Sequence, residues 1–179
     1  RDLKKWIELS KKIKKIKSQV NIGIVGKYFN FKSCRDTYIS VIESINHAAW
    51  AENRKPNIHW LDSEKYEKDA KNLKELDKMD GIIVPGGFGK RGTEGMILAA
   101  KYARENKIPY FGLCLGMQIM TIEFARHTLK EDANSLELNP KTKHPVICTM
   151  EEQIDKIKNK QYGGTMRLGA YAAKLANGS

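Results

Sequence analysis

A cysteine stands between two glycines at the end of a short apolar segment, and this pattern constrains the local fold strongly. Residues 109–118 read Pro-Tyr-Phe-Gly-Leu-Cys-Leu-Gly-Met-Gln, so Gly112 and Gly116 flank Cys114 at two residues on either side. This is the spacing of a Gly-x-nucleophile-x-Gly elbow, in which a buried strand turns sharply into a helix. Glycines suit both positions because larger residues would collide with the neighbouring strand and helix.

The elbow places a thiol at the start of a helix, where the helix dipole favours the thiolate over the thiol. Cys114 is therefore a candidate nucleophile. The alternative is a structural cysteine in a tight strand-to-helix turn, and the elbow pattern alone does not separate the two.

A second glycine-rich segment follows another predicted strand. Residues 81–84 are apolar, and residues 86–95 contain five glycines. Glycines let backbone N–H groups approach a ligand closely. In an open α/β sheet, ligands bind outside the carboxyl ends of the strands, so this segment and Cys114 are expected at the same edge. A thiolate beside free N–H groups suits acyl transfer. A phosphate-binding loop is the weaker alternative, because the segment has no Walker pattern and no Gly-x-Gly-x-x-Gly that opens a helix.

Strands and helices alternate along the chain, which predicts a mostly parallel sheet with helices on both faces, a three-layer flavodoxin-like α/β fold. The helix over residues 115–129 is apolar nearly all round and is expected to be buried. An apolar stripe that includes Trp6 predicts an amphipathic helix near the N-terminus that packs through Trp6. The predicted strands are 20–25, 57–61, 81–84, 108–113 and 145–149, and the other predicted helices are 38–49, 63–78 and 93–106.

The formal net charge of +11 raises the possibility of a polyanionic partner. Eight basic side chains lie within residues 1–17, which fits a solvated helix face, and no nucleic-acid motif is present. No apolar run reaches the length of a membrane span, and no signal peptide is visible. Cys34, Cys114 and Cys148 form no Cys-x-x-Cys pair, so the sequence predicts neither a metal site nor a disulfide framework, and a reducing, cytoplasmic setting fits.

The elbow, together with Pro85-Gly86-Gly87, resembles the class I glutamine amidotransferase family. Three further segments are similar to the glutaminase domain of the CTP synthase family, and the resemblance extends from the Trp6 helix to about residue 175. These segments are residues 87–95, 132–137 and 163–169.

The resemblance implies that Cys114 attacks the side-chain amide of glutamine and that the backbone N–H groups of Gly87 and Leu115 hold the oxyanion. It also implies a set of glutamine-binding residues: Gly87, Phe88, Leu115, Gly116, Met117, Gln118 and Glu137. For Glu137 the alternative is a surface carboxylate, for Gln118 a polar residue at a helix start, and for Phe88 an aromatic ring that pins the glycine-rich turn.

CTP synthases are activated by GTP, and the subfamily-specific segments contain candidate effector residues. These are Arg91, Gly92, Glu94 and Arg167. The alternative for the arginines is a salt bridge that pins a lid.

The catalytic histidine of the family stands in a His-x-Glu pair near the end of the domain, and none of the four histidines here matches it. We therefore expect residues 1–18 to be an interdomain linker helix and residues 19–179 a glutaminase domain that lacks its C-terminal part. Such a chain is expected to be nearly inactive alone.

For the whole enzyme, the resemblance implies sites for ATP, UTP and magnesium on a separate synthetase domain, with no cofactor or metal on this chain. It further implies L-glutamine as substrate, the synthetase domain as partner and a homo-oligomer, a tetramer in the family. The alternatives are another class I amidotransferase, such as the GMP synthase type, or a non-catalytic module of the same fold.

Overall fold

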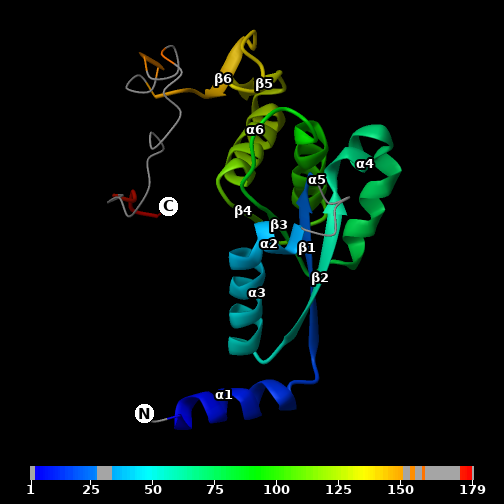
Figure 1. Cartoon of the computed structure of the whole chain (residues 1–179). Coiled ribbons are helices and arrows are strands. Elements are labelled where there is room, and N and C mark those ends of the chain that lie inside the picture. Colours follow the sequence, from blue (N-terminus) through cyan, green and yellow to red (C-terminus); the bar gives the residue numbers. More distant parts are fainter. Residues whose placement is uncertain (1–2, 28–33, 151–153, 156–158, 160–173, 179) are drawn as a thin grey trace. The chain divides into compact units, whose positions relative to one another are not determined.

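The computed structural model describes residues 3–27, 34–150, 154–155, 159 and 174–178 (Figure 1). Helices and strands alternate through most of this range. In chain order the elements are α1 (Lys4–Lys15), β1 (Gln19–Gly26), α2 (Cys34–Thr37), α3 (Ile39–Ala51), β2 (Lys55–Asp62), α4 (Ser63–Lys68), the 3₁₀ helix η1 (Ala70–Lys78), β3 (Gly81–Val84), α5 (Thr93–Glu105), β4 (Tyr110–Gly112), α6 (Leu115–Leu129), β5 (Ala133–Ser135) and β6 (His144–Ile147).

Four strands form a parallel sheet in the order β2-β1-β3-β4. The longest pairing joins β1 to β2 from Gln19 opposite Lys55 to Gly26 opposite Asp62. The predicted parallel α/β fold is confirmed, and the order agrees with that of flavodoxin-like sheets. Because all four strands run the same way, the segments that follow Gly26, Asp62, Val84 and Gly112 meet at one edge of the sheet.

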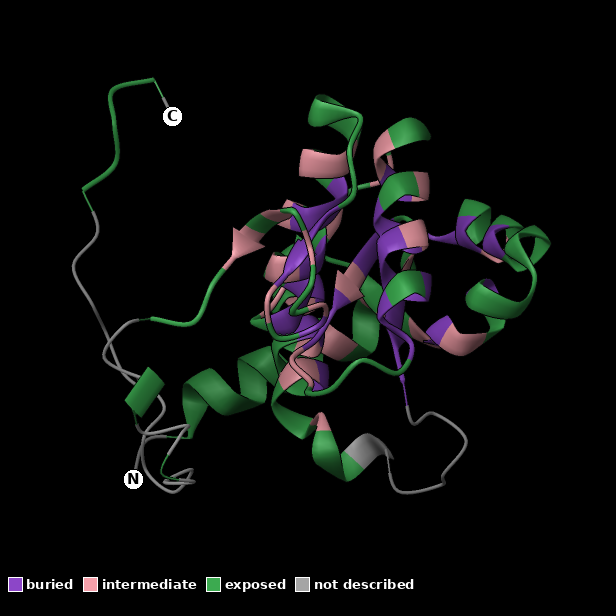
Figure 2. Cartoon of the chain, turned by 90° about the horizontal axis from the view of Figure 1, so that it is seen from above, coloured by how far each residue is buried: buried purple, intermediate pink, exposed green. Residues whose placement is uncertain are grey.

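Both faces of the sheet are covered at its centre. Ile24 and Val25 are neighbours on β1, so they point to opposite faces, and both are fully buried. Val25 belongs to a core cluster built with α4, η1, α5 and α6, whereas α3 contributes a separate set of buried residues: Ile42, Ile45 and Ala49. Figure 2 shows the buried residues concentrated in the strands and on the inner sides of the helices.

The prediction of a single helix over residues 63–78 is wrong, because this segment forms two helices. α4 ends at Lys68, and η1 begins at Ala70. Asp69 between them has extended backbone angles, and its side chain accepts a hydrogen bond from the N–H of Lys71 at 2.9 Å. A carboxylate that caps a new helix in this way competes with continuation of the old one.

The apolar stripe of α1 does not pack as predicted. None of the residues of α1 is buried, and Trp6 is 70% exposed. The amphipathic pattern correctly predicts the helix, but in the described part of the chain only its last turn approaches another element: Ile13 is half-buried and lines a hollow with Asn46 and Trp50 of α3.

α6 has the predicted bounds, yet the expectation that it is buried all round is wrong. Leu115, Gly116, Ile119, Ile122 and Glu123 face the core. Several large apolar side chains on other sides of the helix are exposed: Met117, Met120, Phe124 and Leu129.

A short parallel pair, β5 with β6, forms a second sheet after α6, and β5 was not anticipated. All three residues of β5 are buried, and β5 packs against α6. This pair holds the segment of residues 132–137 close to the α6 helix.

The chain divides into two compact units at residue 147. In the second unit the N–H of Asn159 donates to the carbonyl of Asp155. The segment of residues 163–169, with Arg167, lies outside the described residues. In the described part of the chain, no helix combines the length and apolar character needed to cross a bilayer.

Candidate active site

Cys114 occupies the turn between β4 and α6 in a strained backbone conformation. Its φ is +53° and its ψ is −106°, and the residue is exposed. A non-glycine residue rarely adopts such angles, and residues held in this way cluster at functional sites. The strain therefore agrees with the nucleophile elbow predicted from the sequence.

The two flanking glycines are required by backbone contacts. A Cβ atom on Gly112 would lie 2.4 Å from the backbone of Gly116, and a Cβ atom on Gly116 would lie 2.0 Å from the carbonyl oxygen of Val84. Only glycine lets β3, the elbow and α6 approach this closely. Tyr110 on β4 adds a hydrogen bond from its hydroxyl to the carbonyl oxygen of Gly116, at 3.1 Å.

The glycine-rich loop, residues 85–92, lies beside the elbow as predicted. A Cβ atom on Gly86 would be 3.9 Å from Sγ of Cys114, and a Cβ atom on Gly87 would be 3.4 Å from the side chain of Leu115. Within the described residues, no protein group accepts a hydrogen bond from the N–H of Gly87 or Leu115. Neither N–H group is thus engaged by a described protein acceptor, and both belong to residues beside the elbow.

Lys27 was not selected from the sequence, and it lies under the glycine-rich loop. It follows β1 directly, is 2% exposed, and its Nζ donates to the carbonyl oxygens of Phe88 and Gly89. Burial lowers the pKa of Lys27, and the charge of Arg91 lowers it further. Nearby carboxylates raise it: Glu137, Glu64 and Glu67. A lone lysine after a strand is a weak signal, because lysine side chains are mostly exposed.

The glutamine-binding candidates surround the elbow and the loop. Phe88 is 69% exposed, and Met117 is also exposed. Gln118 is half-buried in the first turn of α6, where its N–H donates to the carbonyl of Cys114. Glu137 is exposed, and its charge acts on Lys27, so its carboxylate lies near the loop. The fold brings these predicted residues to one edge, while their roles stay predictions.

The described effector candidates lie at the end of the loop, Arg91 and Gly92, and in the first turn of α5, Glu94. Nε of Arg91 pairs with Glu64 at 2.9 Å, and about half of the Arg91 side chain is exposed. Gly92 is buried with a φ of +73°, and a Cβ atom there would lie 2.6 Å from Oγ of Ser63. The packing of α4 against α5 thus accounts for Gly92.

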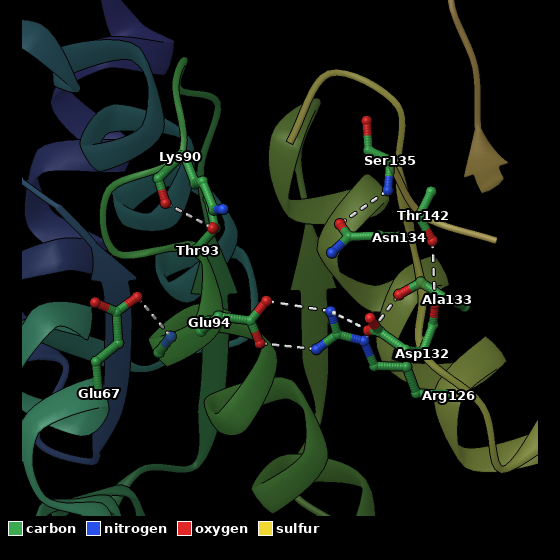
Figure 3. A network of polar contacts seen from close by, with 11 residues as sticks. Glu67, Lys90, Thr93, Glu94, Arg126, Asp132, Ala133, Asn134, Ser135 and Thr142 are labelled. Carbon is green, nitrogen blue, oxygen red and sulfur yellow. Dashed lines mark hydrogen bonds and ion pairs between the residues drawn. The ribbon is translucent and has the colours of Figure 1, made fainter. Parts of the chain in front are cut away.

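Glu94 is part of a polar network that the sequence did not reveal (Figure 3). Its carboxylate accepts two hydrogen bonds from the guanidinium of Arg126, at 2.7 and 3.1 Å. Arg126 also donates to the carbonyl of Ala133 at 2.8 Å and pairs with Asp132 at 3.5 Å. The pKa of Arg126 is raised, mainly by its hydrogen bonds to Glu94. Arg126 thereby ties α5 and α6 to the segment that leads to Glu137.

None of the four histidines is hydrogen-bonded to Cys114, and all four lie in the described ranges. His59 contacts Asn21 and Asn57, and His144 pairs with Glu131. The rings of His47 and His127 lie beside aromatic residues of their own helices, Trp50 and Phe124. Among the described residues, Cys114 therefore has no histidine partner.

Two other features bear on the chemistry. In the described part of the chain, no group of three or more His, Cys, Asp or Glu residues could hold a metal ion. An apolar cavity of about 680 Å³ lies along α6, lined by Tyr110, Met120, Phe124 and their neighbours, and neither Cys114 nor the glycine-rich loop contributes to it.

Comparisons with known proteins agree with this geometry. Residues 33–179 match the family described as glutamine amidotransferase class-I. The chain is 53% identical to a CTP synthase of Clostridium kluyveri and 48% identical to one of Streptococcus pneumoniae, in each case over 99% of this chain and 32% of the relative. The chain therefore spans about a third of the length of the curated relatives it matches.

A solved structure, the glutaminase domain of Trypanosoma brucei CTPS with bound acivicin, superposes with a TM-score of 0.71 and 42% sequence identity. The match covers 78% of this chain and 53% of that chain.

Proposed function

The chain belongs to the class I glutamine amidotransferase family, and we propose that it is the glutamine-hydrolysing part of a CTP synthase. The observation that supports this most is Cys114 in a strained elbow beside the two available N–H groups of Gly87 and Leu115. The high identity to CTP synthases over nearly the whole chain favours this subfamily over the GMP synthase type.

The proposed reaction follows from this arrangement. The thiolate of Cys114 adds to the amide carbon of the glutamine side chain, and the carbonyl electron pair moves onto oxygen. The N–H groups of Gly87 and Leu115 stabilise that oxyanion. Collapse of the intermediate breaks the C–N bond, and ammonia leaves with an added proton. Water then hydrolyses the thioester, which gives glutamate and regenerates the thiol.

Substrate recognition is assigned to the residues around the elbow. The carboxylate of Glu137 suits the α-ammonium group of glutamine, because a charge-assisted pair is stronger than a neutral hydrogen bond. Gln118 supplies an amide at the start of α6, and exposed Phe88 covers the substrate from the loop. Gly116 and Met117 complete the first turn of α6.

The whole enzyme would use the ammonia elsewhere. In this proposal ATP, UTP and magnesium bind to a synthetase domain outside this chain, and residues 1–18 with α1 link the two domains. GTP acts as activator through Arg91, Gly92, Glu94 and Arg167. A cytoplasmic homo-oligomer, a tetramer in the family, completes the proposal.

The test removes only the nucleophile. In the complete enzyme, Cys114→Ala is expected to abolish CTP formation from glutamine and to leave CTP formation from added ammonia unchanged, since the two reactions occur in separate domains. Loss of both activities in a folded protein would contradict the domain assignment.

A chemical test addresses the thiol itself. An electrophilic glutamine analogue is expected to modify Cys114 much faster than Cys34 or Cys148, because only Cys114 stands at a nucleophile elbow. The adduct is mapped by mass spectrometry of the digested protein. Equal modification of all three cysteines would contradict the role of Cys114 and favour a non-catalytic module.

A further inference from the structure

Lys27 is a buried cation that binds backbone carbonyls of the glycine-rich loop. Its Nζ donates to the carbonyl oxygens of Phe88 and Gly89, and the residue is 2% exposed. Burying an ammonium group is unfavourable unless good hydrogen bonds compensate. An apolar side chain of the same length would avoid that cost, so the charge at this position suggests a task other than filling space.

The position of Lys27 in the sheet explains how it reaches the loop. β1 pairs with β3 at Ile24 opposite Ile83, and the chain leaves both strands at the same edge. A Cβ atom on Gly87 would lie 3.7 Å from Cε of Lys27, and one on Gly92 would lie 3.3 Å from Cβ of Lys27. The lysine side chain therefore runs beneath the loop, with its Cβ near Gly92 and its Cε near Gly87.

The orientation of the loop decides where its N–H groups point. In a trans peptide the carbonyl and the N–H point in opposite directions. The peptide that contains the N–H of Gly87 has the carbonyl of Gly86, and this oxygen accepts a hydrogen bond from the Tyr38 hydroxyl at 3.3 Å. Further along the loop, Lys27 binds the carbonyls of Phe88 and Gly89. The loop is thus held at the peptide that contains the proposed oxyanion donor, by Tyr38, and at the carbonyls of Phe88 and Gly89 that follow, by Lys27.

We propose that Lys27 is a positioning residue for glutamine hydrolysis, which holds the carbonyls of Phe88 and Gly89 so that the N–H of Gly87 stays available beside Cys114. This inference rests on the proposed function. Lys27 touches neither the substrate nor the reacting atoms in this role. It acts through the loop, whose glycines would otherwise allow many backbone conformations.

The electrostatic surroundings agree with this role. The pKa of Lys27 is lowered by burial and by Arg91, and it is raised by three carboxylates, among them Glu137. The charge of Lys27 is thus partly balanced by carboxylates around the loop.

The experiment compares Lys27→Met with Lys90→Met in the complete enzyme. Met keeps the length of the side chain and removes the charge and the N–H donors, while Lys90 is an exposed lysine on the same loop. Lys27→Met is expected to lower kcat for glutamine hydrolysis about 10- to 100-fold, somewhat less than the roughly 10²–10³-fold loss typical when one oxyanion donor is deleted. KM for glutamine should change by less than about threefold, and Lys90→Met should match wild type.

The rate of alkylation of Cys114 by iodoacetamide distinguishes positioning from a general structural role. A variant that disturbs the elbow itself would change this rate. This displacement reaction needs the thiolate but no oxyanion hole, so its rate at Cys114 should be the same in Lys27→Met and wild type. A kcat within twofold of wild type, or an equal fall in iodoacetamide reactivity, would overturn the proposal.

A second variant covers the case in which Lys27→Met does not fold. The amide of Lys27→Gln is too short to reach both carbonyls, and the same fall in kcat is expected. The Cys114→Ala variant separates the two hypotheses. If Cys114→Ala still hydrolyses glutamine, the proposed function fails. If only the Lys27 variants behave as wild type, the positioning role alone fails.

Discussion

The carbonyl oxygen of Val84 occupies the space that a side chain on Gly116 would need, so no other residue fits at position 116 without moving the backbone. Gly116→Ala would place its Cβ 2.0 Å from that oxygen, in a core between β3 and α6. We expect this variant to lose several kcal/mol of stability, because well-packed interiors do not relax around such an overlap.

Gly89→Ala is the matched control. Gly89 also lies near the site, but a Cβ atom there would meet nothing within 4 Å, and only its φ of +76° opposes a side chain. The expected cost is about 1–2 kcal/mol, the strain of a left-handed residue. Urea unfolding of both variants measures the difference, and equal losses would contradict the role given to the Val84 contact.

Arg91 distinguishes an effector site from a simple ion pair. Its guanidinium is half exposed while it pairs with Glu64, so a nucleotide could still reach it. We expect Arg91→Ala to weaken activation of glutamine hydrolysis by GTP with little change in KM for glutamine. Glu64→Gln breaks the ion pair and keeps the arginine, so it should retain most of the GTP response. If both variants lose the response equally, Arg91 only pins the loop.

At the scale of elements, two arginines connect α5 with α6 and are expected to behave differently. Arg126 joins Glu94 to the carbonyl of Ala133, ahead of Glu137. Arg104 binds the buried carboxylate of Glu123 through three hydrogen bonds. The first pair is partly exposed and lies next to the proposed substrate segment, whereas the second contains a carboxylate that is only 6% exposed.

Arg126→Met is therefore expected to raise KM for glutamine about tenfold with a small loss of stability. Arg104→Met should leave KM unchanged and lower the free energy of unfolding more than Arg126→Met does, because it leaves the buried carboxylate of Glu123 without its partner. Glutamine kinetics and urea unfolding of the two variants check both expectations. A higher KM in Arg104→Met alone would contradict the assignment of the Asp132–Glu137 segment.

The geometry of the elbow and of the loop could be predicted because it depends on neighbouring residues, while the roles of these residues stay predictions. Cys114 and its two glycines form the elbow within five residues, and the glycine-rich loop follows its own strand. Lys27 could not be assigned in the same way, because its partners lie about sixty residues further along the chain. Its role depends on β1 pairing with β3, which no local pattern reveals.

The errors at this scale have the same origin. Asp69 interrupts a helical pattern because its side chain caps η1, and a single carboxylate in a polar stretch gives little warning of that. The apolar character of α6 suggested full burial, yet Phe124 is 58% exposed. The apolar composition of a helix shows how much surface it is able to bury. How much it does bury depends on the other elements that pack against it.

For the whole molecule, the arrangement of its histidines limits what the chain can do alone. The leaving ammonia must be protonated and the water that attacks the thioester needs a base, and general acid–base help is typically worth roughly 10²–10⁴-fold. His59, His144, His47 and His127 each lie against other side chains, and none is hydrogen-bonded to Cys114. His127 is also near the C-terminal end of α6, and thirteen residues of helix separate it from Cys114 by about 20 Å.

The 179-residue chain by itself is therefore expected to hydrolyse glutamine at only a trace rate, while Cys114 still reacts once with an electrophilic glutamine analogue. Reaction with an electrophilic analogue that releases no ammonia needs the thiolate at the elbow, whereas turnover of glutamine also needs a proton carrier, both for the leaving ammonia and for the attacking water. Ammonia release and the extent of Cys114 modification, both measured on this chain beside the complete enzyme, separate the two steps. Turnover comparable to that of the complete enzyme would require one of the four histidines to act as base, and replacement of each by glutamine would identify it.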